Sequence, residues 1–93
     1  MGTIIHAGLQ LIPLQTVDPE YSLVNKAIDV IKASGLSFKV TPFETVVAGS
    51  FEQIQSLLSS LEQLTKQQSI IEWIIQVRLH GKLNTDLSLS LEV

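Results

Sequence analysis

Two histidines, His6 and His80, are the side chains of this 93-residue sequence best suited to metal binding or proton transfer. The chain has no cysteine, which excludes disulfides, thiolate metal sites and a cysteine nucleophile. Zinc sites in proteins usually use three or four side-chain ligands, and neither histidine has a third ligand near it in the sequence. We therefore predict polar surface or interface histidines, with no metal site and no bound cofactor.

The sequence motifs of common catalytic sites are absent. No serine lies in a G-x-S-x-G motif, and neither the dinucleotide motif G-x-G-x-x-G nor a P-loop occurs. Glu44, Glu52 and Glu72 do not form an evident acid–base pair. These absences favour a protein that binds a molecule over an enzyme.

Four segments have the alternation of apolar and polar residues that a half-buried strand requires. They are residues 3–14, 36–41, 45–49 and 70–80. The first should end close to Pro13, since proline cannot donate to a strand ladder. The second and third are joined by a short connection, which predicts a hairpin. After Gly81 the pattern weakens, and in the tail, residues 82–93, it does not distinguish a strand from a helix that Asn84 or Thr85 would cap.

Local signals at helix ends predict two helices between these strands. Asp18 can cap the first helix, with Pro19 at its first position and Gly35 just after its last turn. Ser50 and Gln53 have the spacing of a capping box, which predicts the start of the second helix. Each helix carries apolar residues on one face: Val24, Ala27, Ile28 and Ile31 in the first, and Ile54, Leu57, Leu58 and Leu61 in the second.

The resulting order, βαββαβ, predicts a single α+β domain over residues 1–93 with a ferredoxin-like fold. In this fold the antiparallel sheet has strand order 4-1-3-2, and both helices lie on one face. The first and fourth strands are then antiparallel neighbours. In one self-consistent register, Leu9 lies opposite Val77 on the core side, and His6 lies opposite His80 on the other face.

Two features of the sequence predict self-association. Charged residues make up only 16% of the chain, against about a quarter in a typical globular domain. The fourth strand is a long apolar edge, and the sheet face without helices carries Ile12, Ile70 and Ile74, a surface that aggregates unless it is covered. We expect a homo-oligomer that buries this face, this edge or both. The alternative is that the chain after Gly81 covers them.

Charge and hydropathy also bear on partners and location. The net charge of −3 disfavours a nucleic-acid backbone as partner. Residues 45–49 lack the aromatic and cationic side chains with which related RNA-binding sheets stack bases. No apolar run is long enough to span a membrane, and the first residues lack the pattern of a signal peptide. We therefore expect a cytoplasmic protein with neither nucleic acid nor membrane as partner.

Residues 34–52, SGLSFKVTPFETVVAGSFE, carry a more specific pattern. It consists of serine-glycine, an extended strand, a proline, a threonine three positions later, and a glycine that opens the second helix. This stretch resembles the core signature of the YkoF-like thiamine-binding domain family. The likeness extends to Pro13 at the end of the first strand and to AIDVI at residues 27–31, and it covers roughly residues 4–81.

The resemblance implies a ferredoxin-like fold, assembly into dimers or tetramers through the sheets, and binding of thiamine or its hydroxymethyl-pyrimidine part without catalysis. The matching positions imply that hydroxyl groups of Ser34, Ser37 and Thr45 contact the ligand, because a hydroxyl both donates to and accepts from an aminopyrimidine. A flat pyrimidine also needs apolar or aromatic walls, for which Phe38, Phe43 and Trp73 are candidates.

Three other functions are compatible with the same elements. The first is a regulatory module that binds amino acids, which shares the element order. The second is a cofactor-free dimeric enzyme of the ferredoxin-like type, for which His6 and His80 are the only histidines available. The third is a purely structural oligomer. Binding of thiamine or its pyrimidine part is the leading hypothesis.

Overall fold

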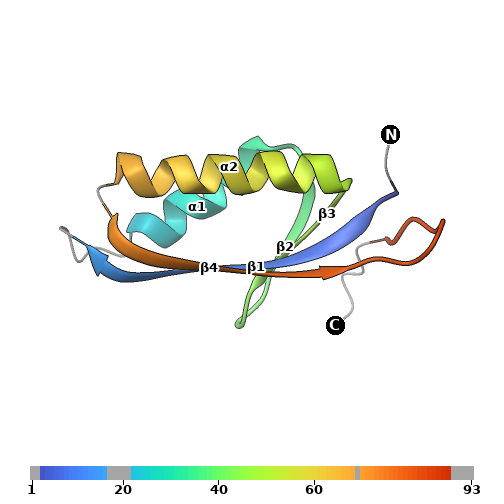
Figure 1. Cartoon of the computed structure of the whole chain (residues 1–93), viewed down its shortest axis with the longest axis horizontal. Coiled ribbons are helices and arrows are strands. Elements are labelled where there is room, and N and C mark those ends of the chain that lie inside the picture. The colour runs from blue at the N-terminus through green and yellow to red at the C-terminus, as the bar shows by residue number, and fades with distance from the viewer. Residues whose placement is uncertain (1–2, 17–21, 69, 89–93) are drawn as a thin grey trace.

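The computed structural model describes residues 3–16, 22–68 and 70–88 (Figure 1). Its elements are, in chain order, β1 (Ile5–Thr16), α1 (Ser22–Ala33), β2 (Ser37–Val40), β3 (Thr45–Gly49), α2 (Phe51–Gln67) and β4 (Ile70–His80). The four strands form one antiparallel sheet in the order β2-β3-β1-β4. This is the predicted order 4-1-3-2 counted from the opposite edge, so the ferredoxin-like α+β fold is confirmed.

The pairing of β1 with β4 follows the predicted register. Leu9 lies opposite Val77, and His6 lies opposite His80. The first strand does not end near Pro13, however, but continues to Thr16. The register shifts after Pro13, and such an irregularity accommodates a residue that has no N–H for the ladder.

The end signals of the helices are confirmed where the structure describes them. The Ser50 hydroxyl accepts a hydrogen bond from the Gln53 N–H, and the Gln53 side chain accepts one from the Ser50 N–H, which completes the capping box. Gly35 follows α1 with a φ of 78°, the left-handed conformation that glycine adopts without strain. The predicted cap at Asp18 lies outside the described residues.

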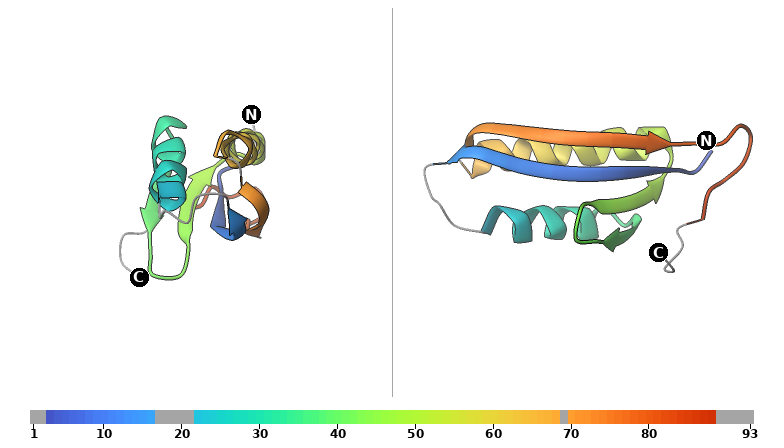
Figure 2. Two further views of the ribbon diagram at one scale, coloured as in Figure 1. Left: turned by 90° about the vertical axis from the view of Figure 1, so that its left-hand side faces the viewer. Right: turned by 90° about the horizontal axis from the view of Figure 1, so that it is seen from below.

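Both helices cover the same face of the sheet, and the opposite face has no helix over it (Figure 2). The buried core between helices and sheet consists of Ala7, Leu9, Ala27, Ile31, Val47, Ile54, Leu57, Leu61 and Leu64. Of the apolar positions predicted on the two helices, five belong to this buried core: Ala27, Ile31, Ile54, Leu57 and Leu61. Among the described residues, no helix has the length and apolar character needed to cross a lipid bilayer.

The described part of the tail returns to the start of β1. Lys82 and Thr85 form an isolated bridge around a turn in which Asn84 has a φ of 49°. The Leu87 N–H then donates to the Ile4 carbonyl oxygen at 3.0 Å. Residues 81–88 therefore contain no helix, and they do not cover the free edge of β4.

The four strands differ greatly in length, which leaves part of β1 without a partner on one side. The last pair between β1 and β3 joins Leu9 to Thr45. From residue 10 onward β1 pairs with β4 alone, and the long β1–β4 ribbon extends past the short β2–β3 hairpin (Figure 2). An open edge of β1 therefore faces toward α1 beside the hairpin loop (Figure 2).

The capping box gives a test of the fold. We expect Ser50→Ala to lower the free energy of unfolding by about 1 kcal/mol, because the N–H of Gln53 loses its acceptor. Urea denaturation of both proteins measures the difference. Ser59→Ala, at an exposed position in the same helix, is the control and should leave stability nearly unchanged. An equal loss in both variants would show that the cap does not stabilise α2.

Candidate functional site

A cleft of about 170 Å³ occupies the place where β1 loses its neighbouring strand. Its main walls are the open edge of β1 around Gln10, the inner face of α1 around Ile28 and Ile31, and the loop between β2 and β3, and residues of α2 and β4 also line it. Its lining is mostly apolar and consists of Leu9, Gln10, Leu11, Ala27, Ile28, Ile31, Val40, Thr41, Pro42, Phe43, Glu44, Thr45, Leu61 and Ile75. The cleft is therefore a consequence of the unequal strand lengths.

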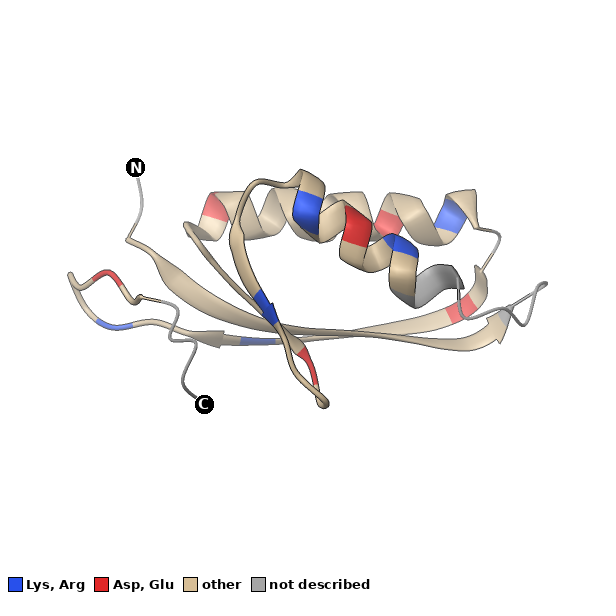
Figure 3. Cartoon of the chain, turned by 180° about the vertical axis from the view of Figure 1, so that it is seen from behind, with Lys and Arg blue, Asp and Glu red and all other residues tan. Residues whose placement is uncertain are grey.

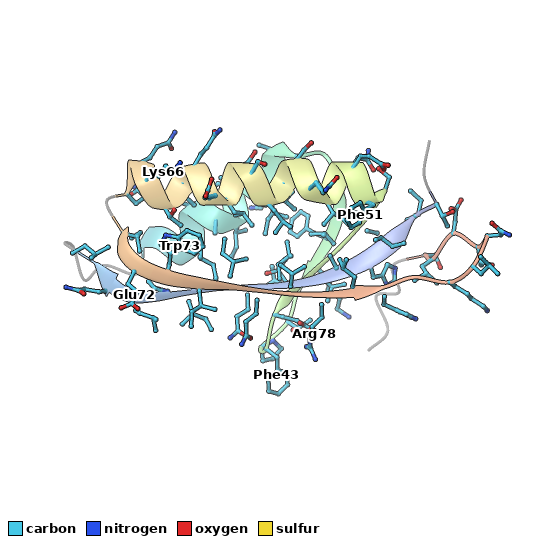
Figure 4. All side chains as sticks on the ribbon, in the orientation of Figure 1. Phe43, Phe51, Lys66, Glu72, Trp73 and Arg78 are labelled. Atoms are coloured by element: carbon cyan, nitrogen blue, oxygen red, sulfur yellow. The ribbon has the colours of Figure 1, made fainter. Side chains whose placement is uncertain are left out.

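The hairpin loop that forms one wall is held by the hydroxyl group of Thr41. This oxygen accepts hydrogen bonds from the N–H groups of Phe43 and Glu44, at 3.2 and 3.0 Å, and donates to the Glu44 carbonyl oxygen at 2.7 Å. The Thr41 N–H bonds to the same carbonyl. Phe43 lies at the tip of this loop with 80% of its surface exposed (Figure 4). The hydrogen-bonded loop thus carries an exposed aromatic ring beside the cleft.

Thr45 brings an uncommitted hydroxyl group to the cleft. It is half-buried, and its hydroxyl makes no hydrogen bond with any part of the chain that the structure describes. The neighbouring Thr41 hydroxyl is already engaged within the loop. The open edge of β1 adds backbone N–H and C=O groups, which always require partners when water is displaced. The cleft therefore combines apolar walls with a few groups that can both donate and accept.

The size of the cleft limits what it can hold. An engineered protein cavity of roughly 150 Å³ accepts one benzene molecule. A cleft of about 170 Å³ has room for one six-membered aromatic ring and not for two. A ligand with two rings would have to leave one of them outside.

Glu44 lies at the boundary between this cleft and the open face of the sheet. Its carboxylate folds over Gly8 so closely that a Cβ at Gly8 would lie 2.4 Å from Oε1, so no other residue fits there without displacing the carboxylate. Arg78 Nη2 donates to the same oxygen at 2.7 Å. This hydrogen bond, together with the attraction of the opposite charges, raises the pKa of Arg78 above its ordinary value.

The two histidines lie together on the open face, as the register predicts. Their ring centroids are 6.2 Å apart, with the rings at 77° to each other. His6 Nε2 is inaccessible to solvent and has no hydrogen-bond partner in the described structure. No group of three or more metal-ligating side chains occurs within residues 3–16, 22–68 and 70–88. Neither histidine lines the cleft.

The structure brings two of the five predicted site residues, Phe43 and Thr45, together in the cleft. Ser34 lies instead at the end of α1, beside a groove between the two helices. Its hydroxyl donates to the Ile31 carbonyl oxygen and accepts from the Leu36 N–H. Both bonds belong to the helix terminus, so this hydroxyl is committed to local structure.

Ser37 and Phe38 also lie away from the cleft. Successive residues of a strand point to opposite faces, and Phe38 is opposite the buried Val47, so Phe38 packs against the core while Ser37 faces the helix-free side. Both border a hollow beside Leu87 of the tail. Neither of these two motif residues therefore lines the cleft.

Gln10 and Thr41 are cleft residues that the motif did not indicate. The relevant signal was present in the strand lengths, because a first strand of about twelve residues cannot be covered by a neighbour of five. The side of β1 on which the uncovered edge falls then follows from the sheet order. Residue type alone does not distinguish Gln10 from the other glutamines of the chain.

Solved structures share this fold. A domain of unknown function from Bacillus cereus has a TM-score of 0.87 and 22% sequence identity, over 100% of this chain and 89% of that one. A Thermotoga maritima protein, provisionally assigned to thiamine biosynthesis or salvage, has a TM-score of 0.77 and 20% identity, over 96% and 91%. A Streptococcus pneumoniae protein has a TM-score of 0.74 and 22% sequence identity, over 87% of this chain and 90% of that one. At these identities the likeness establishes the fold.

Family membership comes from the sequence itself. No protein with a curated description matches it. The family model described as "Thiamine-binding protein" matches residues 7–92, which include nearly all of β1, the hairpin, both helices and β4. The match thus covers the cleft and every element that encloses it. The chain belongs to the thiamine-binding protein family.

Proposed function

We propose that this chain is a single-domain cytoplasmic protein that binds thiamine through its hydroxymethyl-pyrimidine part, without catalysing a reaction. The observation that carries this proposal is the one-ring cleft, which lies within the part of the chain that the family model matches. The provisional assignment of the Thermotoga maritima protein to thiamine biosynthesis or salvage is consistent with the same ligand class.

The chemistry of the cleft suits an aminopyrimidine. The ring would lie between the apolar side chains of α1 and the hairpin, with Phe43 as an aromatic wall. The amino group and ring nitrogens need both donors and acceptors, which the Thr45 hydroxyl and the open edge of β1 supply. Of the five residues that the motif indicates, we retain Phe43 and Thr45 as ligand contacts.

The composition of the cleft supports binding over catalysis. Among the described residues that line it, only Glu44 is ionisable, and its carboxylate is already paired with Arg78. An enzyme of the cofactor-free type would need a group that exchanges protons beside the substrate. The two histidines, which that alternative would use, lie on the other face of the sheet.

We also propose that the chain forms a homo-oligomer through its sheet. The described part of β1 carries no charged side chain, and β4 carries only Glu72 and Arg78, whereas charges of both signs lie on the helices (Figure 3). Large apolar residues are exposed along β4, namely Ile71, Ile74, Val77 and Leu79. β4 also lies at the edge of the sheet, and the described tail does not pair with it. A second copy of the chain is the simplest cover for these surfaces.

The proposed ligand contact can be tested by calorimetry. We expect thiamine and hydroxymethyl-pyrimidine to bind with micromolar dissociation constants, about −8 kcal/mol. Thr45→Val should weaken both about fivefold, because a hydrogen bond contributes about 1 kcal/mol. Ser37→Ala removes another hydroxyl of the same motif that lies outside the cleft, and it should have no effect.

Two results would contradict this proposal. Absence of both binding heat and a thermal shift at millimolar thiamine would exclude the ligand. An equal loss of affinity in Ser37→Ala and Thr45→Val would remove the reason to place the ligand in the cleft.

The oligomer proposal has its own test. Light scattering at micromolar concentration should give the mass of a dimer or tetramer. Ile74→Lys, on the helix-free face where 42% of Ile74 is exposed, should shift the mass toward the monomer, because a buried lysine without a partner is strongly unfavourable. Gln55→Lys, at an exposed position of α2, adds the same charge as a control. A monomeric wild-type protein would refute the proposal.

A further inference from the structure

A second hollow adjoins the cleft on the helix-free face of the sheet. We call it the charged hollow, and it is lined by Gly8, Gln10, Glu44, Gln76, Val77 and Arg78. Its volume is about 560 Å³. Gln10 and Glu44 line both the charged hollow and the cleft, so the two spaces meet at the open edge of β1.

The charged hollow contains one cation and one anion close together. The Glu44 side chain is mostly buried, with 22% exposed, whereas 77% of the Arg78 side chain is exposed. Only one nitrogen of the guanidinium group, Nη2, bonds to the carboxylate. The other N–H donors of Arg78 remain available, since a guanidinium group has five. The hollow therefore offers a carboxylate near the cleft and a guanidinium group farther out, on the side away from the helices (Figure 4).

Thiamine carries its own charges in an order that matches this arrangement. Its pyrimidine ring is neutral, its thiazolium ring is cationic, and its hydroxyethyl arm is the place where a phosphate ester adds negative charge. With the pyrimidine ring in the cleft, a thiazolium ring that extends past Gln10 and Glu44 would enter the charged hollow, since these two residues line both spaces. A phosphate on the arm would then reach the position of Arg78.

We propose that the charged hollow is a second subsite, which makes this protein prefer a phosphate ester of thiamine to thiamine itself. The inference rests on the proposed function, because it needs the pyrimidine ring in the cleft. Glu44 holds the thiazolium cation, and Arg78 binds the phosphate through charge-assisted hydrogen bonds. Inorganic phosphate alone binds poorly, because the nearby Glu44 carboxylate repels an anion that carries no compensating cation.

Calorimetry on the full chain with thiamine, thiamine monophosphate and inorganic phosphate tests this subsite. We expect the monophosphate to bind about tenfold more tightly than thiamine, the effect of one hydrogen bond to a charged group. Arg78→Gln should remove this preference, so that the variant binds thiamine and thiamine monophosphate with equal affinity. Lys66→Gln is the matched control, since Lys66 is also exposed and lies 3.8 Å from a glutamate, Glu62, on α2. It should keep the full preference.

The outcomes separate the two proposals. If thiamine and its monophosphate bind equally well to the wild type, the second subsite is excluded while the proposed function stands. The same holds if Arg78→Gln keeps the preference, or if inorganic phosphate binds as tightly as the monophosphate. If neither thiamine compound binds, the proposed function itself fails and the subsite fails with it.

Discussion

The long antiparallel pairing between β1 and β4 is the constraint from which the candidate site follows. These two strands pair along nearly their whole lengths, from His6 opposite His80 to Thr16 opposite Ile70. β3 pairs with β1 only as far as Leu9. Because a sheet leaves unpaired N–H and C=O groups wherever one strand outruns its neighbour, the open edge of β1 needs a cover. α1 and the hairpin loop partly enclose it, and the space that remains is the cleft.

A single ion pair joins this cleft to the opposite face of the sheet. Glu44 belongs to the hairpin loop through its backbone, and its carboxylate reaches across Gly8 to Arg78 on β4. A mostly buried carboxylate requires such a partner, because burial of an unpaired charge is costly. The absence of a side chain at Gly8 is what permits the contact. The loop that carries Phe43 and leads into Thr45 of β3 is thereby connected to β1 and β4 as well.

Local sequence patterns were sufficient for much of the fold. The capping box at Ser50, the left-handed Gly35 and the register of β1 with β4 each depend on neighbouring residues or on a two-residue period, which can be read directly. Pro13 misled the prediction of the strand end, because a shift in register can absorb a missing N–H.

The site was harder to predict, because it depends on which side of a strand lacks a neighbour. Residue type indicated Ser34, Ser37 and Thr45 equally, since all three carry a hydroxyl group. Tertiary structure separates them: Ser34 completes a helix end, Ser37 faces away from the core, and only Thr45 lines the cleft. The path of the Glu44 side chain across Gly8 likewise depends on contacts between segments that are distant in sequence.

The most direct test of this account is a titration of isotope-labelled protein with hydroxymethyl-pyrimidine alone, followed through the amide signals in nuclear magnetic resonance spectra. The account predicts that the largest shifts occur in residues 9–11 of β1 and 41–45 of the hairpin, the backbone that encloses the cleft. Shifts concentrated in the groove between α1 and α2, or in the hollow beside the tail, would contradict the central claim that the cleft holds the pyrimidine ring.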